Sequence, residues 1–403
     1  KATPLQENLD NFGKKLAILI IIISSIIFGL SMYRGAPIMD SLMFAISLAV
    51  AAIPEALSSI VTIVLAFGTR KLAEENAIIR KLHSVESLGS ISIICSDKTG
   101  TLTQNKIGGG SMKNIKVGGL LECSSVVMGC MRIDKMPVKE VEQLIFTAAL
   151  CNVNFFDHAD IYGGGLSEEV FGKALRLHPE AREKIILQTK CGIRGGYYDF
   201  SKEHIIESVE GSLKRLQTDY VDILLLHRPD TLMEPEEVAE AFDKLYSEGK
   251  VRHFGVSNQN PMQIELLKKY VKQPLLVNQL QLSVKVTGMI DSGFNVNMQN
   301  PPSIMHDGSV LEYCRLNDIT IQAWSPFQYG FFEGVFLNHD KFPELNDCIS
   351  RIASEYGVTD SAVAVAWILR HPANMQVVTG TTNANRFTDI CKGADITLTR
   401  EQW

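Results

Sequence analysis

The chain has 403 residues, too many for one small domain and enough for a large barrel with an extension. Its 39 basic and 45 acidic side chains give a net charge of −6 with no arginine-rich run, which argues against a nucleic-acid partner. The eight cysteines stand singly, without a CxxC pair or a histidine at metal-ligand spacing. We therefore expect reduced thiols, with neither a disulfide framework nor a metal site.

Two apolar runs near the N-terminus predict a transmembrane hairpin. Residues 16–33 would form a helix about 27 Å long, close to the roughly 30 Å hydrocarbon core of a bilayer. Residues 42–68 form a second apolar run, broken at Pro54-Glu55. Lysines precede the first run, and an arginine-lysine pair follows the second, so both ends are expected in the cytoplasm. This predicts a membrane partner through residues 16–68 and a membrane-anchored protein whose later part is cytoplasmic; two buried core helices are the alternative.

The segment Cys95–Thr103 reads CSDKTGTLT and contains Asp97 within DKTGT at 97–101. It resembles the phosphorylation site of P-type cation pumps. Four earlier positions resemble the ion site in the fourth membrane span of the calcium-pump branch: Val50, Ala51, Ile53 and Glu55. An acidic side chain at membrane depth costs about 2.5 to 3.5 kcal/mol and usually has a functional reason. The resemblance implies that residues 1–107 are a fragment of such a pump, with an incomplete phosphorylation-domain stub.

Residues 108–111 read GGGS, the composition of a flexible linker with a reach of roughly 11 Å. An ordinary glycine-rich turn is the alternative. We favour a linker because the character of the sequence changes completely across it, from apolar runs to alternating short and amphipathic segments. The sequence therefore predicts a separate domain over residues 112–403.

Within residues 112–403, short apolar runs alternate with amphipathic segments. Strands are expected at 125–128, 153–157, 185–189, 221–226, 251–256, 275–279, 319–323 and 376–378. Helices are expected between them, including 138–150, 202–216, 235–248 and 262–271. Eight strand-helix alternations over roughly 290 residues predict an α/β fold, the (β/α)8 or TIM barrel. A long Asn-, Gly- and Pro-rich connection, 283–309, is expected to form a lid or a substrate wall, with a disordered insertion as the alternative.

Four polar residues lie at or just after separate predicted strands: Asp157, Tyr162, Lys190 and His227. In a barrel, such strand ends converge on one pocket. A tyrosine with an ordinary pKa near 10 is a poor acid at neutral pH, but a nearby ammonium lowers that pKa, and a carboxylate keeps the ammonium charged. A histidine can orient a carbonyl oxygen toward the phenol. Each residue alone also has a structural explanation, such as a turn cap or a core histidine; their joint placement favours protonation of an oxygen while hydride reaches its carbon.

This combination resembles the aldo-keto reductases, and residues 112–403 are identified as a member of that family. Their SPF and NQxQLS motifs resemble those of its bacterial branch. The resemblance implies that NADPH reduces a small aldehyde or ketone, with Tyr162 as general acid. NADH is also possible, because Gly380 stands where many members have a basic residue. Further cofactor contacts are implied at Ser257, Asn258, Gln279, Trp324, Ser325, Phe327, Gly380, Thr381, Thr382 and Arg386.

The resemblance also implies roles within that set. Ser257, Asn258 and Gln279 match residues that hold the nicotinamide carboxamide, and Trp324 matches an aromatic stacked on its ring. Arg386 matches a ligand of the 2′-phosphate, a group that suits the guanidinium fork. Two alternatives to the reductase are a cation transporter phosphorylated at Asp97, here expected to be incomplete and inactive, and a binding subunit of the potassium-channel type.

Overall fold

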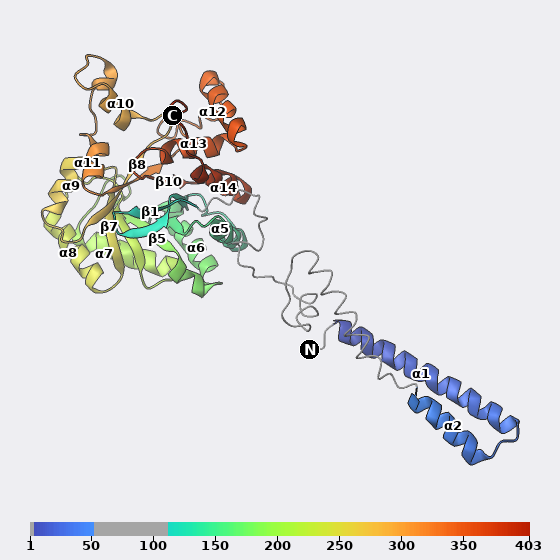
Figure 1. Cartoon of the computed structure of the whole chain (residues 1–403). Coiled ribbons are helices and arrows are strands. Elements are labelled where there is room, and N and C mark those ends of the chain that lie inside the picture. The colour runs from blue at the N-terminus through green and yellow to red at the C-terminus, as the bar shows by residue number, and fades with distance from the viewer. Residues whose placement is uncertain (1–3, 52–111) are drawn as a thin grey trace. The chain divides into compact units, whose positions relative to one another are not determined.

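A computed structural model describes residues 4–51 and 112–403 of the chain (Figure 1). The chain divides into two compact units, Lys1–Gln104 and Asn105–Trp403, and each is described by itself. The predicted linker at 108–111 lies outside the described residues. So do the predicted stub and its Asp97, together with Ile53 and Glu55.

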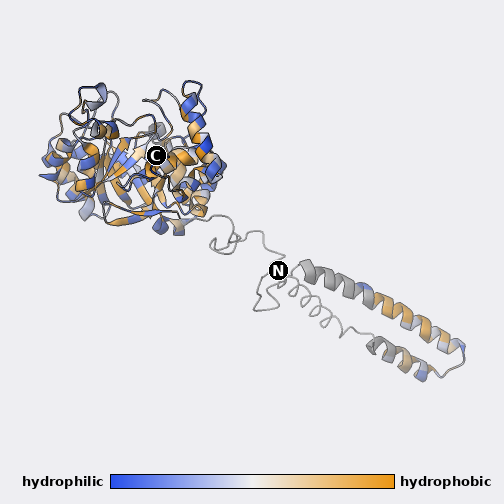
Figure 2. Ribbon diagram, turned by 45° about the horizontal axis from the view of Figure 1, so that its top comes forward, coloured by the Kyte–Doolittle hydropathy of each residue, from blue (hydrophilic) through white to orange (hydrophobic). Residues whose placement is uncertain are grey.

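The described part of the first unit is a pair of helices, α1 (Pro4–Tyr33) and α2 (Ile38–Ala51), that pack against each other. Near their connection the hydroxyls of Ser31 and Ser41 lie 2.8 Å apart. Figure 2 shows that much of α1 is hydrophobic, and many of its large apolar side chains are exposed. Val50 and Ala51, predicted to belong to an ion site, are the last two residues of α2.

No helix in the described part of the chain combines the length and apolar character needed to cross a bilayer. The predicted hairpin therefore has no support from the structure. Its second predicted span, 42–68, continues past the end of α2 into residues that the structure does not describe.

The second unit contains a closed barrel of parallel strands, which confirms the predicted (β/α)8 fold. Each strand begins and ends within two residues of its predicted run. The strands, in barrel order from β3, are β3 (Val126–Gly129), β4 (Phe155–Asp157), β5 (Ile186–Cys191), β6 (Val221–Leu226), β7 (Val251–Ser257), β8 (Leu275–Gln281), β9 (Thr320–Trp324) and β10 (Gln376–Thr379). The last strand pairs with both β9 and β3, which closes the barrel.

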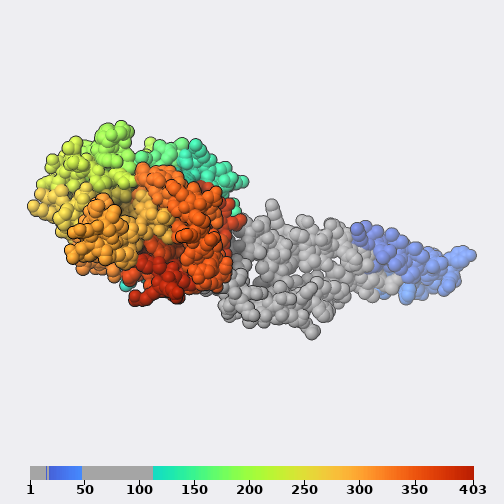
Figure 3. All heavy atoms as spheres, turned by 90° about the horizontal axis from the view of Figure 1, so that it is seen from above, coloured from blue at the N-terminus to red at the C-terminus, as the bar shows by residue number. Residues whose placement is uncertain are grey.

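Helices surround the barrel. The α-helices are α5 (Val138–Leu150), α6 (Leu166–Leu175), α7 (Lys202–Leu216), α8 (Pro235–Ser247), α9 (Pro261–Lys268), α10 (Gly288–Phe294), α11 (Val310–Leu316), α12 (Pro343–Tyr356), α13 (Asp360–Leu369) and α14 (Ala384–Cys391). Short 3-10 helices are η1 (Tyr162–Gly165), η2 (Pro179–Lys184), η3 (Pro301–Ser303) and η4 (Lys392–Asp395). The connections after β8 and β9, coloured orange in Figure 3, lie on the face that is seen from above.

Local sequence explains where these helices begin and which face they bury. At α7 the Ser201 hydroxyl accepts a hydrogen bond from the His204 backbone N–H, the usual N-cap arrangement. The buried side chains of α7 include Ile205, Val209 and Leu213, which recur every four residues and so form one apolar stripe. This stripe belongs to the main hydrophobic core, which fills the layer between strands and helices.

A β-hairpin that the sequence analysis did not predict closes the end of the barrel at which the strands begin. It consists of β1 (Asn114–Val117) and β2 (Leu121–Ser124), which are antiparallel. Val117 packs among buried residues near the starts of the barrel strands, and the Gly118 N–H donates to the Thr320 hydroxyl at the start of β9. A Cβ on Gly118 would lie 2.5 Å from Leu276, so only glycine fits this turn. The hairpin leaves the carboxyl ends of the strands as the open face.

Candidate functional site

The structure brings the four predicted catalytic residues together at the carboxyl ends of neighbouring strands. Asp157 ends β4, Lys190 lies near the end of β5, and His227 directly follows β6. The Lys190 ammonium donates to Asp157 Oδ2 at 2.8 Å and to the Tyr162 hydroxyl at 3.1 Å. Lys190 is completely buried, so this cation lies beneath the open face, behind the Tyr162 hydroxyl and the Asp157 carboxylate.

Three glycines set the position of Tyr162. Gly163, Gly164 and Gly165 all have positive φ, a conformation that residues with a side chain adopt at a cost. A Cβ on Gly163 would come within 2.4 Å of Asp134. The sequence YGGG therefore allows a tight turn at η1 that holds the phenol beside the ends of β4 and β5.

The electrostatics of the tyrosine differ from the expectation. Burial raises the pKa of Tyr162 above its ordinary value, and the Lys190 ammonium lowers it without reversing that effect. Burial also lowers the pKa of Lys190, but Asp157 and Tyr162 more than offset this, and the net pKa is raised. The lysine thus lowers the pKa of Tyr162 as predicted, but the expectation that the net pKa falls below its ordinary value is wrong for the protein alone. Lys190 is held as a cation, and Tyr162 as a neutral phenol.

His227 faces the tyrosine. The two ring centroids are 6.0 Å apart and the rings are nearly perpendicular, at 83°. Burial, together with Lys190 and Arg228, holds the pKa of His227 well below its ordinary value, so the imidazole is neutral. Its Nδ1 is buried without a hydrogen-bond partner among the described residues.

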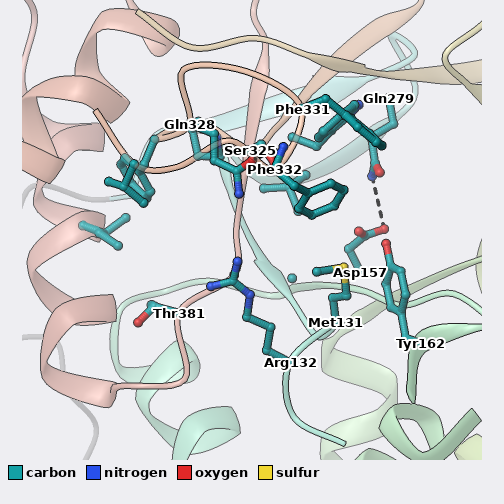
Figure 4. Close-up of a pocket in the computed structure, with 18 of the residues that line it drawn as sticks. Met131, Arg132, Asp157, Tyr162, Gln279, Ser325, Gln328, Phe331, Phe332 and Thr381 are labelled. Carbon is teal, nitrogen blue, oxygen red and sulfur yellow. Dashed lines mark hydrogen bonds between the residues drawn. The ribbon is translucent and has the colours of Figure 1, made fainter. Parts of the chain in front are cut away.

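Beneath Asp157 lies a buried network of glutamines that sequence reasoning did not anticipate. Gln188 donates to Asp157 Oδ1 at 2.6 Å, and Gln279 donates to the same oxygen at 3.2 Å, as Figure 4 shows for Gln279. Both amides also donate to Gln322, which donates in turn to Gln376. Because Oδ1 is occupied in this way, Oδ2 is left to Lys190. The network fixes the orientation of the carboxylate.

A cavity of about 1130 Å³ opens above these residues (Figure 4). Asp157, Tyr162 and His227 line it. So do the predicted cofactor residues Ser257, Asn258, Gln279, Trp324, Ser325, Phe327, Gly380, Thr381 and Arg386. Thr382 is not among the lining residues, so the structure does not bring that predicted contact to the cavity.

One group of predicted cofactor residues is tied together by hydrogen bonds. The Trp324 indole donates to Asn258 Oδ1 at 3.1 Å, and the Asn258 amide donates to the Ser257 hydroxyl at 2.8 Å. Ser257 donates to the backbone carbonyl of Gln279 at 3.1 Å. Asn258 has a φ of 57°, which turns the chain sharply after β7 and aims its side chain into the cavity. A planar polar group placed here would meet fixed amide and hydroxyl partners.

The cavity is also rich in cationic side chains. Arg132, Arg228 and Arg386 line it, and within residues 112–403 none of them forms an ion pair. Its lining carboxylates are engaged elsewhere, Asp157 by Lys190 and Asp389 by Lys392. Three guanidinium groups without acidic partners suit a ligand that carries several negative charges.

The sequence profile of the Aldo/keto reductase family matches residues 125–403. The chain belongs to the aldo/keto reductase family. As a member it is an oxidoreductase, and the observed geometry agrees with that assignment: an acid, a cation and a neutral histidine converge beside a large polar cavity.

Curated relatives of this aldo/keto reductase span its barrel. Uncharacterized oxidoreductase YcsN of Bacillus subtilis is 36% identical over 308 residues, covering 72% of this chain and 96% of its own length. A 6-dehydroglucose reductase of Agrobacterium fabrum is 34% identical over 307 residues, with the same coverage. Among solved structures, a thermostable aldo-keto reductase shares the fold with a TM-score of 0.58 at 24% identity, covering 72% of this chain and 97% of that one.

The N-terminal part is similar to a different class of protein. Calcium-transporting ATPase 1 of Lactococcus lactis is 52% identical over 117 residues, and a calcium-transporting ATPase of Listeria monocytogenes is 55% identical over 117 residues. Each match covers 27% of this chain and 13% of the ATPase. The similarity thus extends to a small part of those ATPases.

The walls of the cavity differ from the prediction. None of residues 283–309, expected to form a lid or substrate wall, lines the cavity. That role falls to the segment after β9, where Phe331 and Phe332 reach the cavity although each is more than half exposed. Arg228 lies 5.7 Å from the rings of both Trp324 and Phe331. An arginine directly after the predicted catalytic histidine in HRPD was the available sequence signal for it.

Proposed function

We propose that Tyr162 is the general acid with which this aldo/keto reductase protonates the carbonyl oxygen of a small aldehyde or ketone during NADPH-dependent reduction. The observation that carries the proposal is the contact between the Tyr162 hydroxyl and the Lys190 ammonium at the base of the cavity, 3.1 Å long. A phenol that faces the cavity and accepts a hydrogen bond from a buried cation can release its proton outward and be left as a stabilised phenolate.

Each neighbour has a defined part in this transfer. Lys190 stabilises the phenolate because it stays charged, and Asp157 keeps it charged at 2.8 Å. A neutral His227 can donate one N–H to the carbonyl oxygen and hold it beside the phenol. The buried glutamines keep Asp157 from turning away from the lysine. These four side chains deliver one proton to one oxygen.

The cavity suits a nicotinamide dinucleotide. Ser257, Asn258 and Gln279 offer amide and hydroxyl groups for the carboxamide, and the unpaired Arg386 offers a guanidinium for the 2′-phosphate. When bound there, NADPH supplies the hydride that reaches the carbonyl carbon. NADH stays possible, because Gly380 brings no cation to that end of the cavity.

Replacement of the phenol by a phenyl ring tests the proposal. Tyr162→Phe removes only the hydroxyl, so we expect kcat for reduction of an aromatic aldehyde to fall by about 10³-fold or more, while the Kd for NADPH changes less than about threefold. Cofactor oxidation and fluorescence titration on the full chain measure the two quantities. Turnover comparable with that of the wild-type chain would refute the assignment.

We propose that residues 1–107 take no part in the reduction and are joined to the barrel by a linker at 108–111. The similarity of this part to only 13% of each calcium-transporting ATPase supports an inactive fragment. Labelled ATP should therefore leave no phosphate on Asp97; a phosphoenzyme would favour the transporter alternative. Attachment to a membrane through residues 16–68, with the barrel in the cytoplasm, stays a prediction that extraction of cell membranes with alkaline carbonate would check.

A further inference from the structure

Arg132 is a cation in the cavity that the proposed proton transfer does not use. It lies in the connection between β3 and α5, directly after Met131, and both residues are exposed and line the cavity. Figure 4 shows its guanidinium reaching into the open space. Within residues 112–403 it forms neither an ion pair nor a side-chain hydrogen bond.

The position of Arg132 relative to the other polar groups is informative. In Figure 4 its guanidinium lies between Thr381 on one side and the pair Asp157 and Tyr162 on the other. The segment with Ser325 and Gln328 lies across the opening from it. Under the proposed function, Tyr162 marks the end where the nicotinamide reacts, and Thr381 with Arg386 marks the end that takes the 2′-phosphate. The part of a dinucleotide between these two ends is its pyrophosphate.

Charge and shape favour the same match. The pyrophosphate carries two negative charges, and a guanidinium offers planar, paired N–H donors that suit phosphate oxygens. The other two arginines are placed for other groups: Arg386 lies in the first turn of α14, and Arg228 lies beside the rings of Trp324 and Phe331. The described residues that line the cavity include no lysine and no further arginine. Arg132 is thus the cation available for the middle of the cofactor.

We propose that Arg132 binds the pyrophosphate of the cofactor and reaches over it from the β3 side toward the Ser325–Gln328 segment. This inference rests on the proposed use of a nicotinamide dinucleotide. It makes Arg132 a binding residue that does not touch the reacting atoms. It also distinguishes Arg132 from Arg386, because NADPH and NADH share the pyrophosphate but only NADPH has the 2′-phosphate.

Affinities for both cofactors test this directly. In Arg132→Gln we expect the Kd values for NADPH and NADH to rise by the same factor, about 10-fold or more, as for loss of a charged hydrogen bond. Arg132→Lys keeps the positive charge but loses the paired N–H donors of the guanidinium, so its Kd values should lie between those of the wild type and the glutamine variant. Reduced nicotinamide riboside has neither phosphate of the pyrophosphate, so its kcat/KM should change much less.

The control is Arg386→Ala, in which the loss should be confined to NADPH. Fluorescence-detected unfolding verifies that the variants fold, because the three tryptophans of the chain, Trp324, Trp367 and Trp403, all lie in the barrel unit. Unchanged affinity in Arg132→Gln would overturn the inference. So would a loss limited to NADPH, or a change confined to the KM of negatively charged carbonyl substrates. Failure of the wild-type chain to bind either cofactor would instead overturn the proposed function.

Discussion

The Lys190 ammonium lies 3.1 Å from the Tyr162 hydroxyl, and the lysine is completely buried whereas the tyrosine reaches the cavity. A buried cation is costly unless it is paired, and Asp157 at 2.8 Å meets that need. The arrangement places a positive charge directly behind a hydroxyl group that faces the cavity. It prepares the site for a negative oxygen that exists only after the proton has left, and this is the state an acid catalyst must stabilise.

Removal of the Lys190 charge should therefore slow the reduction step without weakening the binding of NADPH. In Lys190→Met, a side chain of similar length replaces the ammonium, and we expect kcat to fall by about 10²- to 10⁴-fold. The Kd for NADPH should stay within about threefold, because Lys190 does not line the cavity. Single-turnover mixing and fluorescence titration separate the two. A large loss of cofactor affinity with normal single-turnover rates would argue against the role.

The pH dependence of reduction follows from two shifted groups. A general acid must be protonated, and burial raises the pKa of Tyr162 above its ordinary value of 10.0. The pKa of His227 lies well below 6.5, so it does not titrate near neutrality. We expect the single-turnover rate to be flat from about pH 6 to 9 and to decline only above the ordinary tyrosine pKa. A midpoint between pH 6.5 and 8 would contradict this assignment.

The preference for NADPH should depend on Arg386. This residue is exposed, lines the cavity and is not ion-paired in the barrel unit, and its backbone N–H is held by the Asn383 side chain at the start of α14. Arg386→Ala should weaken NADPH about 10-fold or more and NADH less than twofold, since charged hydrogen bonds to phosphate are strong. Titration with each cofactor measures this. Equal losses would show that Arg386 does not recognise the 2′-phosphate.

Much of the barrel could be predicted from the sequence. Buried parallel strands give short continuous apolar runs, whereas the helices between them give apolar residues at every third or fourth position. The four polar residues after those runs converge for the same topological reason. The β1–β2 hairpin was missed since its exposed face and short strands resemble a loop in sequence. The glutamine network was missed because Gln188 and Gln322 lie 134 residues apart, and their contact depends on barrel register.

The assignment of residues 283–309 to a lid or a substrate wall was the main error. The sequence favoured 283–309 because of its length and its Asn, Gly and Pro content. In the structure, that connection includes α10 and η3 and does not line the cavity, while residues after β9 line it. Composition predicts that a segment is irregular, but not the direction in which it leaves its strand. Likewise, the raised pKa of Tyr162 depends on burial, which a sequence does not give as a quantity.

A carboxylate beside the site is expected to limit stability at alkaline pH. Asp160 has a buried Oδ1 without a hydrogen-bond partner in the described part of the chain, and burial together with Glu168 raises its pKa from 3.8 to about 7. Folding then favours the protonated form, so this carboxyl costs nothing below pH 4 and costs most above pH 7. Asp160→Asn should stabilise the barrel at pH 8 by about 2 kcal/mol and have no effect near pH 4.

Denaturant unfolding followed by tryptophan fluorescence measures this difference in the full chain, because all three tryptophans lie in the barrel unit. The side chain of asparagine has nearly the same shape, so packing is conserved. A variant that is equally more stable at both pH values would show that shape or hydrogen bonding, and not ionisation, is responsible. A variant that is less stable at pH 8 would mean that the ionised carboxylate contributes to folding.

Deletion of residues 1–107 tests whether the two units depend on each other. The barrel is closed by pairing of β10 with β3 and β9, all within the second unit. The end at which the strands begin is covered by the β1–β2 hairpin, which begins at Asn114. Every described residue that lines the cavity lies between Gly129 and Ile390. The shortened chain should therefore fold and bind NADPH with a Kd within about twofold of the full chain, as expected for independent domains. Loss of affinity with an intact barrel, judged by its tryptophan-detected unfolding, would show that the first unit contributes to the site.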